Sequence, residues 1–215
     1  MTVTREQPSD PLSDTAHGFL PHTDREPGLV DLDAAESAAR DFLRHLGVAL
    51  GTEAAAHTPG RMARAYAELL SPRPFSLTTF PNDHGYEGFV IARDIPVQSV
   101  CEHHFLPFTG VAHVGYLPGS RIVGLSKLAR VVEHFSRRPQ VQERLTQQIA
   151  SCLAEQLDAD AVGVVVEAEH LCMSMRGVQV SGSVTTTSAM LGALSKDAEL
   201  RREFLSLINP ASPGR

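Results

Sequence analysis

The spacing of apolar residues changes several times along this chain, and these changes limit its fold more than any other feature. Residues 33–47, and those after Thr58-Pro59, have the spacing of helices, whereas residues 89–101 and 110–117 read as extended strands followed by a Pro118-Gly119 turn. Two helices, two strands and a last helix follow. Paired strands with helices between them indicate an α+β domain with an antiparallel sheet.

Capping residues locate the first helices. One is expected to begin near Asp33, with Glu36 three residues later as in a capping box, and to end at Gly47. Thr58-Pro59 is expected to open the second, because proline is favoured in a first turn. The inward stripe of the first helix is expected to be Ala35, Ala39, Phe42 and Leu46.

Between the strand pairs, Ser126 is expected to cap a helix that residues 137–139 break, and a second helix follows. Residues 161–173 are expected to form a Val-rich strand, residues 183–190 a Thr-rich strand and residues 197–208 the last helix. The residues expected to face inward from these three helices are Leu128, Val131, Val132 and Phe135; Val141, Leu145, Ile149, Cys152 and Leu153; and Leu200, Phe204 and Leu207.

The two ends of the chain differ in composition from the middle. Residues 1–30 carry four prolines among polar residues and are expected to be a disordered N-terminal arm, with residues 210–215 as a flexible tail. Residues 31–72 form the expected N-terminal helical region. Residues 73–209 form the expected sheet domain.

Composition excludes several classes of protein. A formal net charge of -6 argues against a general nucleic-acid binder. Three cysteines are too few for a disulfide framework and favour a reducing compartment. No apolar run approaches membrane-spanning length, and residues 1–10 lack the apolar segment of a signal peptide. We therefore expect a cytoplasmic protein that binds neither nucleic acid nor membrane.

Residues 101–104, Cys-Glu-His-His, place a thiol, a carboxylate and two imidazoles side by side. Cys101 and His104 have a short metal-ligand spacing, and His170 and Cys172 lie far downstream. On a strand these two would face one side, because residues two apart do. If that strand neighbours the segment ending at His104, then Cys101, His104 and Cys172 form a zinc site with one open position. His103 and His170 remain as proton carriers.

Other interpretations of these residues stay open. Cys101 and Cys172 can be ordinary buried thiols. A closed structural zinc site needs a fourth ligand, and Cys152 lies in an apolar helix stripe that favours a core role. His113 and His134 have no partner pattern.

A second set of residues fits an anionic ligand. Lys127 and Arg130 follow Ser126 at the start of a helix, where N–H groups and the helix dipole favour phosphate. Arg61 and Arg176 add further cations. The alternative for each is a solvated charged face.

Glu143 lies in the first turn of the next helix, with Gln142 beside it. Its carboxylate either complements the helix dipole or accepts two N–H bonds from a guanine-type edge. Beside a metal site and several cations, this carboxylate suggests a purine nucleotide with a polyphosphate.

Five segments, in this order, resemble GTP cyclohydrolase I: residues 101–104, 115–118, 124–130, 138–146 and 170–177. The resemblance covers about residues 33–208. It implies the tunnelling fold (T-fold), with residues 73–209 as its catalytic domain, in which the antiparallel sheets of several subunits join into a barrel. The family is typically a homodecamer of two pentameric rings (D5 symmetry), with active sites at subunit interfaces.

The resemblance also implies a reaction, in which GTP and water give 7,8-dihydroneopterin triphosphate and formate. By position, Cys101, His104 and Cys172 would bind Zn²⁺, which activates the water that attacks C8 of the purine. His170 would transfer protons as the imidazole ring opens, and His103 would assist.

For the substrate, the resemblance implies that Glu143 holds the guanine edge, with Gln142 beside it. The residues implied to bind the triphosphate, some of them from a neighbouring subunit, are Ser126, Lys127, Arg130, Arg176 and Arg61. Glu143 would select GTP over ATP, because adenine presents the wrong donors and acceptors to a carboxylate.

Two other functions are compatible with such a fold. One is a non-catalytic T-fold protein that binds a purine or pterin, and the other is a T-fold enzyme of different chemistry. Residues 47–57 carry less charge than the family pattern leads us to expect, which affects the packing of the N-terminal helices and Arg61. The sequence leaves open which pathway uses the product.

Overall fold

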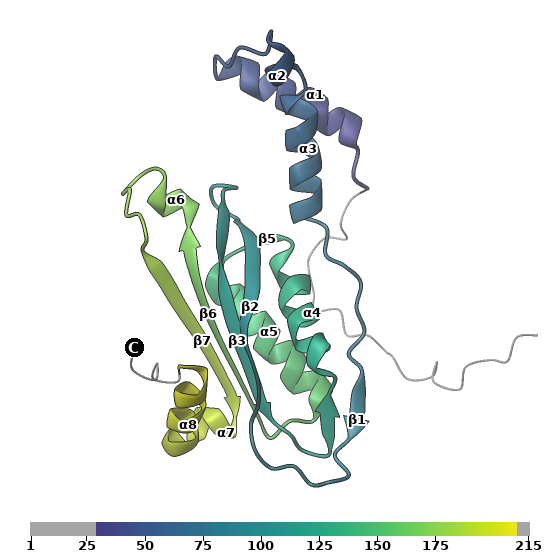
Figure 1. Cartoon of the computed structure of the whole chain (residues 1–215), viewed down its shortest axis with the longest axis vertical. Helices are drawn as coiled ribbons and strands as arrows, with labels where there is room; N and C mark the ends of the chain where they lie inside the picture. Colours follow the sequence, from purple (N-terminus) through teal and green to yellow (C-terminus); the bar gives the residue numbers. More distant parts are fainter. Residues whose placement is uncertain (1–28, 210–215) are drawn as a thin grey trace, which may run out of the picture.

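A computed structural model describes residues 29–209 of the chain (Figure 1). The expected tail, residues 210–215, and all but the last two residues of the expected arm lie outside the described residues. The described part combines one larger sheet, mostly antiparallel, with helices on both of its faces, which confirms the predicted α+β class. No helix within residues 29–209 has both the length and the apolar character needed to cross a membrane.

Three N-terminal helices stand beyond one end of the sheet (Figure 1): α1 (Leu32–His45), α2 (Glu53–Ala56) and α3 (Thr58–Leu69). Helix α3 begins at Thr58 with proline in its first turn, as predicted. The cap of α1 is Asp31 rather than the predicted Asp33, because the Asp31 side chain accepts a hydrogen bond from the Ala34 N–H at 2.9 Å. The predicted position was therefore two residues late.

The apolar stripe predicted for α1 is mostly exposed within the single chain. Ala39 is buried, but Phe42 and Leu46 are 55% and 64% exposed. Helix α1 packs against α3 and does not reach the main core. The helical spacing was predicted correctly, whereas the burial of this face was not.

The larger sheet has the strand order β5-β2-β3-β6-β7. Its strands are β2 (Val90–Cys101), β3 (Pro107–Leu117), β5 (Pro139–Gln140), β6 (Ala161–His170) and β7 (Val184–Gly192). All neighbouring pairs are antiparallel except β2 with β5. Strands β1 (Thr79–Pro81) and β4 (Arg121–Val123) form a separate antiparallel pair.

Strand β3 brings two distant parts of the chain together. The hairpin from β2 into β3 pairs Val100 with Pro107, and on the other side of β3 Phe108 pairs with His170. The last residue of β2, Cys101, and the last residue of β6, His170, therefore lie at the same end of the sheet. This end carries the candidate site.

Helices α4 (Leu125–Ser136) and α5 (Gln142–Leu157) cover one face of the sheet (Figure 1). Their buried apolar residues include most of those predicted: Leu128, Val131, Val132, Phe135, Leu145, Ile149, Cys152 and Leu153. The cap of α4 is Gly124, and no side chain caps this helix. The prediction that Ser126 caps it was therefore wrong.

The opposite face is covered by α7 (Ala193–Lys196) and α8 (Ala198–Ile208). Asp197 caps α8 by accepting hydrogen bonds from two N–H groups. Phe204 is fully buried, as predicted, whereas Leu207 is 44% exposed and Ile208 takes the inward position instead. The prediction for Leu207 was therefore wrong.

The predicted strand over residues 161–173 ends at His170, and the short helix α6 (Leu171–Ser174) follows. His170 and Cys172 therefore do not share a strand face, which corrects the geometry assumed from sequence. Residues 171–174 lack the β-branched side chains that dominate residues 161–166, and this loss is the signal in the sequence that was missed.

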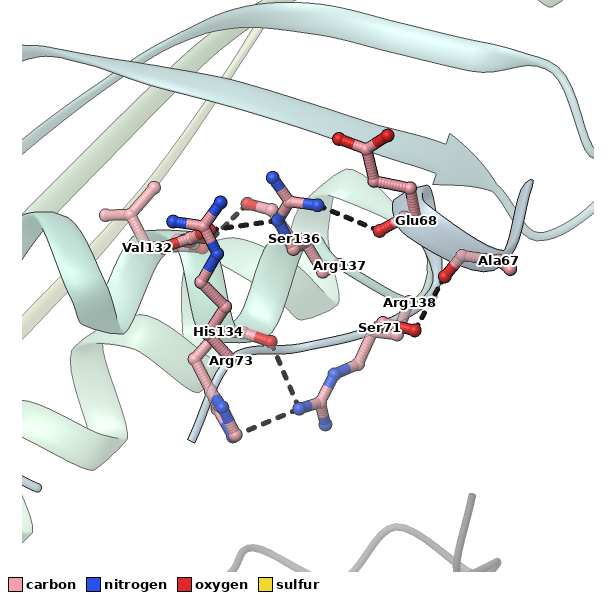
Figure 2. Close-up of polar contacts among 10 residues, drawn as sticks. Ala67, Glu68, Ser71, Arg73, Val132, His134, Ser136, Arg137 and Arg138 are labelled. Atoms are coloured by element: carbon pink, nitrogen blue, oxygen red, sulfur yellow. Dashed lines mark hydrogen bonds and ion pairs between the residues drawn. The ribbon is translucent and has the colours of Figure 1, made fainter. Parts of the chain in front are cut away.

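The end of α3 and the segment after it contact the C-terminal end of α4 (Figure 2). The Arg137 guanidinium donates to the Glu68 carbonyl at 2.8 Å. Arg73 and Arg137 both pair with Glu133. Arg138 donates to the ring and to the carbonyl of His134, both at 3.1 Å. The Arg137–Glu68 and Arg73–Glu133 contacts connect the N-terminal region to the sheet domain, whereas the Arg138–His134 contacts are local to the end of α4.

Candidate active site

Two cysteines that are distant in sequence meet at this end of the sheet. Cys101 is the last residue of β2, and Cys172 lies in α6, directly after β6. Their sulfur atoms are 3.9 Å apart, and the residues are 5% and 9% exposed. Burial, and then the neighbouring Cys101, raise the pKa of the Cys172 thiol, while Arg176 lowers it.

Two imidazoles lie next to the thiol pair. One ring nitrogen of His170 and the two sulfurs all lie within 4.8 Å of one another. His104 stands outside this closest group, but its Nδ1 is 3.9 Å from Cys101 Sγ. Both His103 and His104 are exposed on the turn between β2 and β3, whereas His170 is half-buried.

The distances fit a tetrahedral zinc site. With Zn–S bonds of about 2.3 Å, two sulfurs on a tetrahedral ion lie roughly 3.8 Å apart, and a sulfur and an imidazole nitrogen about 3.6 Å apart. The observed separations, 3.9 Å for both Cys101–Cys172 and Cys101–His104, agree with these values. Thiolates and imidazoles are also the donors that zinc prefers.

His170 is held by its neighbours. Its ring stacks on Phe108 with centroids 4.5 Å apart and planes inclined by 11°. Its Nε2 is 2.7 Å from Oε1 of Gln142. Burial lowers the pKa of His170, and the nearby carboxylate of Glu143 acts in the opposite direction.

The turn that carries the two exposed histidines is braced on two sides. Arg144 pairs with Glu102, and this contact lowers the pKa of the Glu102 carboxyl. Arg144 also donates to the Gln140 side chain at 2.9 Å. From α3, the Tyr66 hydroxyl donates to the Phe105 carbonyl at 3.0 Å, and the two rings stack.

The residues predicted to bind the substrate differ in exposure and lie on different elements. Glu143 is exposed in the first turn of α5, near His170. Gln142 is only 2% exposed, and its amide bonds within the chain. Arg176 follows α6 and is exposed, while Arg61 is exposed on α3 and donates to the Ala54 carbonyl at 3.3 Å.

Ser126, Lys127 and Arg130 lie far from the thiols of the same chain. They belong to the first turns of α4, which follows β4 at the Leu117 end of β3. The thiols lie at the Pro107 end, and an eleven-residue strand spans roughly 35 Å. A single chain therefore does not bring Ser126, Lys127 or Arg130 to its own thiol pair.

Sequence reasoning did not identify three supports of the site: the Phe108 ring under His170, the Arg144–Glu102 pair and the Tyr66–Phe105 contact. Each joins residues that are distant in sequence, so no local pattern indicates them. The predicted strand over residues 110–117 begins after Phe108, whereas β3 begins at Pro107 and includes it.

Comparison with known proteins agrees with this arrangement. The family described as GTP cyclohydrolase I matches residues 35–209. A GTP cyclohydrolase 1 of Corynebacterium glutamicum is 50% identical over 183 residues, covering 83% of this chain and 93% of that protein. One from Rhodopirellula baltica is 45% identical, covering 98% and 91%. One from Aquifex aeolicus is 47% identical, covering 83% and 97%.

A solved structure titled archaeosine synthase QueF-Like aligns with 50% of this chain and 96% of that chain, at 16% identity and a TM-score of 0.42. The fold is that of an α+β protein, and its thiol–imidazole group can hold a metal ion. The chain belongs to the GTP cyclohydrolase I family.

Proposed function

We propose that this protein is a zinc-dependent GTP cyclohydrolase I that converts GTP and water to 7,8-dihydroneopterin triphosphate and formate. The observation that carries the proposal is the meeting of Cys101 and Cys172, with sulfurs 3.9 Å apart, beside His170. Membership of the family supplies the reaction. A place at the start of pterin or folate-type biosynthesis, in the cytoplasm, follows as part of the same proposal.

Cys101, Cys172 and His104 are the proposed zinc ligands. Zinc, when bound, supplies a Lewis acid that activates water near neutral pH. The choice of His104 rests on its 3.9 Å distance from Cys101 and on its exposed, adjustable position. His170 is the alternative third ligand, since it belongs to the closest geometric group.

His170 is the proposed proton carrier. A half-buried imidazole that remains neutral near pH 7 can accept a proton and return it as the purine ring opens. His103, exposed on the neighbouring turn, is the proposed assistant. The stacking of His170 on Phe108 keeps its ring in a fixed plane.

Glu143 is the proposed contact for the guanine edge, because it is exposed in the first turn of α5 and close enough to His170 to affect that residue's pKa. Gln142 lies beneath it. The residues proposed to bind the triphosphate are Arg176, Arg61, Ser126, Lys127 and Arg130. Cation–phosphate contacts are strong where they replace water.

The proposed assembly is a homodecamer with D5 symmetry in which the sheets join into T-fold barrels. Strand β7 supports it, because this strand is an edge of the five-stranded sheet among residues 29–209. The distance between the first turn of α4 and the thiols of the same chain supports the assembly too, because one chain does not bring these residues to its own thiols. Lys127 and Arg130 would complete the site of a neighbouring subunit.

The test is incubation of zinc-loaded protein with GTP, followed by assay of formate and of a fluorescent pterin. The proposal expects one formate for each GTP consumed, and no formate from ATP. Binding of GTP without formate release would instead support the non-catalytic T-fold protein and contradict the proposal.

A further inference from the structure

Gln142 is buried at the start of α5, and every hydrogen-bonding group of its side chain contacts the same chain. Its Nε2 donates to the backbone carbonyls of Val166 and Thr185, at 3.0 and 2.8 Å, and lies 3.2 Å from the Thr187 hydroxyl. Its Oε1 faces His170 Nε2 at 2.7 Å. The side chain therefore joins α5 to β6, to β7 and to an imidazole of the site.

The two carbonyls fix the orientation of the Gln142 amide. If the amide were turned over, its oxygen would face two carbonyl oxygens at hydrogen-bonding distance with no proton between them. Unpaired acceptors in a buried position cost free energy. The nitrogen must therefore face Val166 and Thr185, and the oxygen must face His170.

The adjacent hydroxyls are consistent with this orientation. Thr146 donates to the Gln142 backbone carbonyl at 2.8 Å, so its only proton is used. Thr187, 2.6 Å from the Thr146 oxygen, must then donate to it. The Thr187 oxygen then turns lone pairs rather than a proton toward the Gln142 nitrogen, as this orientation requires, while the two amide protons go to the Val166 and Thr185 carbonyls.

A fixed amide oxygen in turn decides the state of His170. An amide oxygen can only accept, so His170 Nε2 must carry a proton. A neutral imidazole has one N–H group, and the lone pair therefore lies on Nδ1. The other tautomer would place two lone pairs 2.7 Å apart. Phe108, fully buried and stacked on the ring, opposes a rotation that would exchange the nitrogens.

We infer that Gln142 is a positioning residue that holds His170 as its Nε2–H tautomer and so makes Nδ1 the nitrogen that faces the reacting groups. The inference rests on the proposed function, because it assigns a working nitrogen to His170. It also gives Gln142 a role different from the guanine contact that the sequence predicts.

Zinc-loaded protein labelled with ¹⁵N-histidine, sedimented and measured by magic-angle-spinning NMR, tests the inference. His170→Asn identifies the two ring signals of His170 by their loss. We expect a protonated Nε2 and an unprotonated Nδ1 in the unsubstituted protein at pH 8. A protonated Nδ1 would overturn the inference, whether or not a variant at Gln142 folds.

Gln142→Met keeps the length of the side chain and removes the amide. We expect His170 to populate both tautomers, kcat to fall about 10- to 100-fold, and the KM for GTP and the zinc content to remain near those of the unsubstituted protein. Gln147→Met, an exposed position on the same helix, is the matched control. A raised KM with an unchanged tautomer would overturn the inference in favour of a guanine contact.

Failure of this inference can be told apart from failure of the proposed function. If the unsubstituted protein releases no formate from GTP, the proposed function is wrong. The NMR signals still decide whether Gln142 controls the tautomer of His170.

Discussion

At the scale of single residues, His134 shows how burial and a fixed cation together set the charge of an imidazole. Arg138 donates to its Nε2 at 3.1 Å, and a guanidinium cannot accept, so His134 must present a lone pair there. Burial, and then the charge of Arg138, lower the pKa of His134. The folded protein therefore holds this histidine neutral.

This arrangement makes stability depend on pH in a definite direction. The folded pKa of His134 lies below its unfolded value near 6.5. At pH values between the two, the unfolded chain therefore binds more protons than the folded chain does. The stability that the neutral His134 contributes is fully present above about pH 7, and it is lost as the pH falls through 6.5 towards the folded pKa. Thermal unfolding of unsubstituted protein at pH 7.5 and pH 5.5 measures it.

His134→Gln supplies the comparison, because its amide oxygen accepts from Arg138 but does not titrate in this range. We expect the variant to lose less stability between the two pH values than the unsubstituted protein does. His45→Gln at the exposed end of α1 is the control. An equal loss in the unsubstituted protein and in His134→Gln would contradict the assignment.

Residue types and order were sufficient to predict that Cys101 and Cys172 meet, but not which residues support the site around them. That prediction rested on the ligand spacing of Cys101 and His104, on the downstream pair His170 and Cys172, and on the resemblance to GTP cyclohydrolase I. The Phe108 stack and the Gln142 network depend on strand register, which only the folded chain defines. Ser126 was assigned as a cap from its identity alone, although α4 begins at Leu125 and its N-cap is Gly124.

At the scale of elements, the docking of α8 depends on glycines in the sheet. Phe204 is fully buried over Gly163 and Gly115. A Cβ added at Gly163 would lie 2.6 Å from the Phe204 ring, closer than side chains approach. The absence of a side chain at this position on β6 therefore allows the helix to approach the sheet.

We expect Gly163→Ala to lower the free energy of unfolding by about 1–3 kcal/mol, because the Phe204 ring and α8 must move away. Urea unfolding measures the change. Gly51→Ala is the matched control, since an added Cβ there meets nothing within 4 Å. A Gly163→Ala protein as stable as this control would show that α8 does not press on the sheet.

The elements that bury one apolar face against the sheet were the easiest to predict from sequence. Helices α4 and α5 were predicted well because each buries one stripe against one sheet face. Helix α1 has a comparable stripe, but Phe42 and Leu46 remain exposed within the single chain. Strand β6 was extended too far, because apolar residues continue past His170 while the backbone turns into α6.

At the scale of the whole molecule, a net charge of -6 coexists with the cations proposed to bind a triphosphate. Long-range repulsion by the protein and local attraction by the site act on GTP together, and salt screens both. Because the proposed cation–phosphate contacts are direct, we expect the KM for GTP to rise with ionic strength. Initial rates between 0.05 and 0.5 M KCl measure this, and a KM independent of salt would contradict the phosphate assignments.

The proposed assembly makes a separate prediction about mass. Light scattering during gel filtration is expected to give about ten times the chain mass of 23.2 kDa. Lys127→Ala protein mixed with Glu143→Ala protein should regain part of the activity after subunit exchange, because each would complete a site in its neighbour. An active monomer would contradict a shared site.

The most direct test of the central claim is the zinc content and formate production of three variants measured side by side. We expect Cys172→Ala to lose both zinc and turnover, because one of two converging thiols is gone. His104→Ala should lose zinc, whereas His170→Ala should retain zinc and lose turnover. Full zinc occupancy and normal formate release by Cys172→Ala would contradict the account.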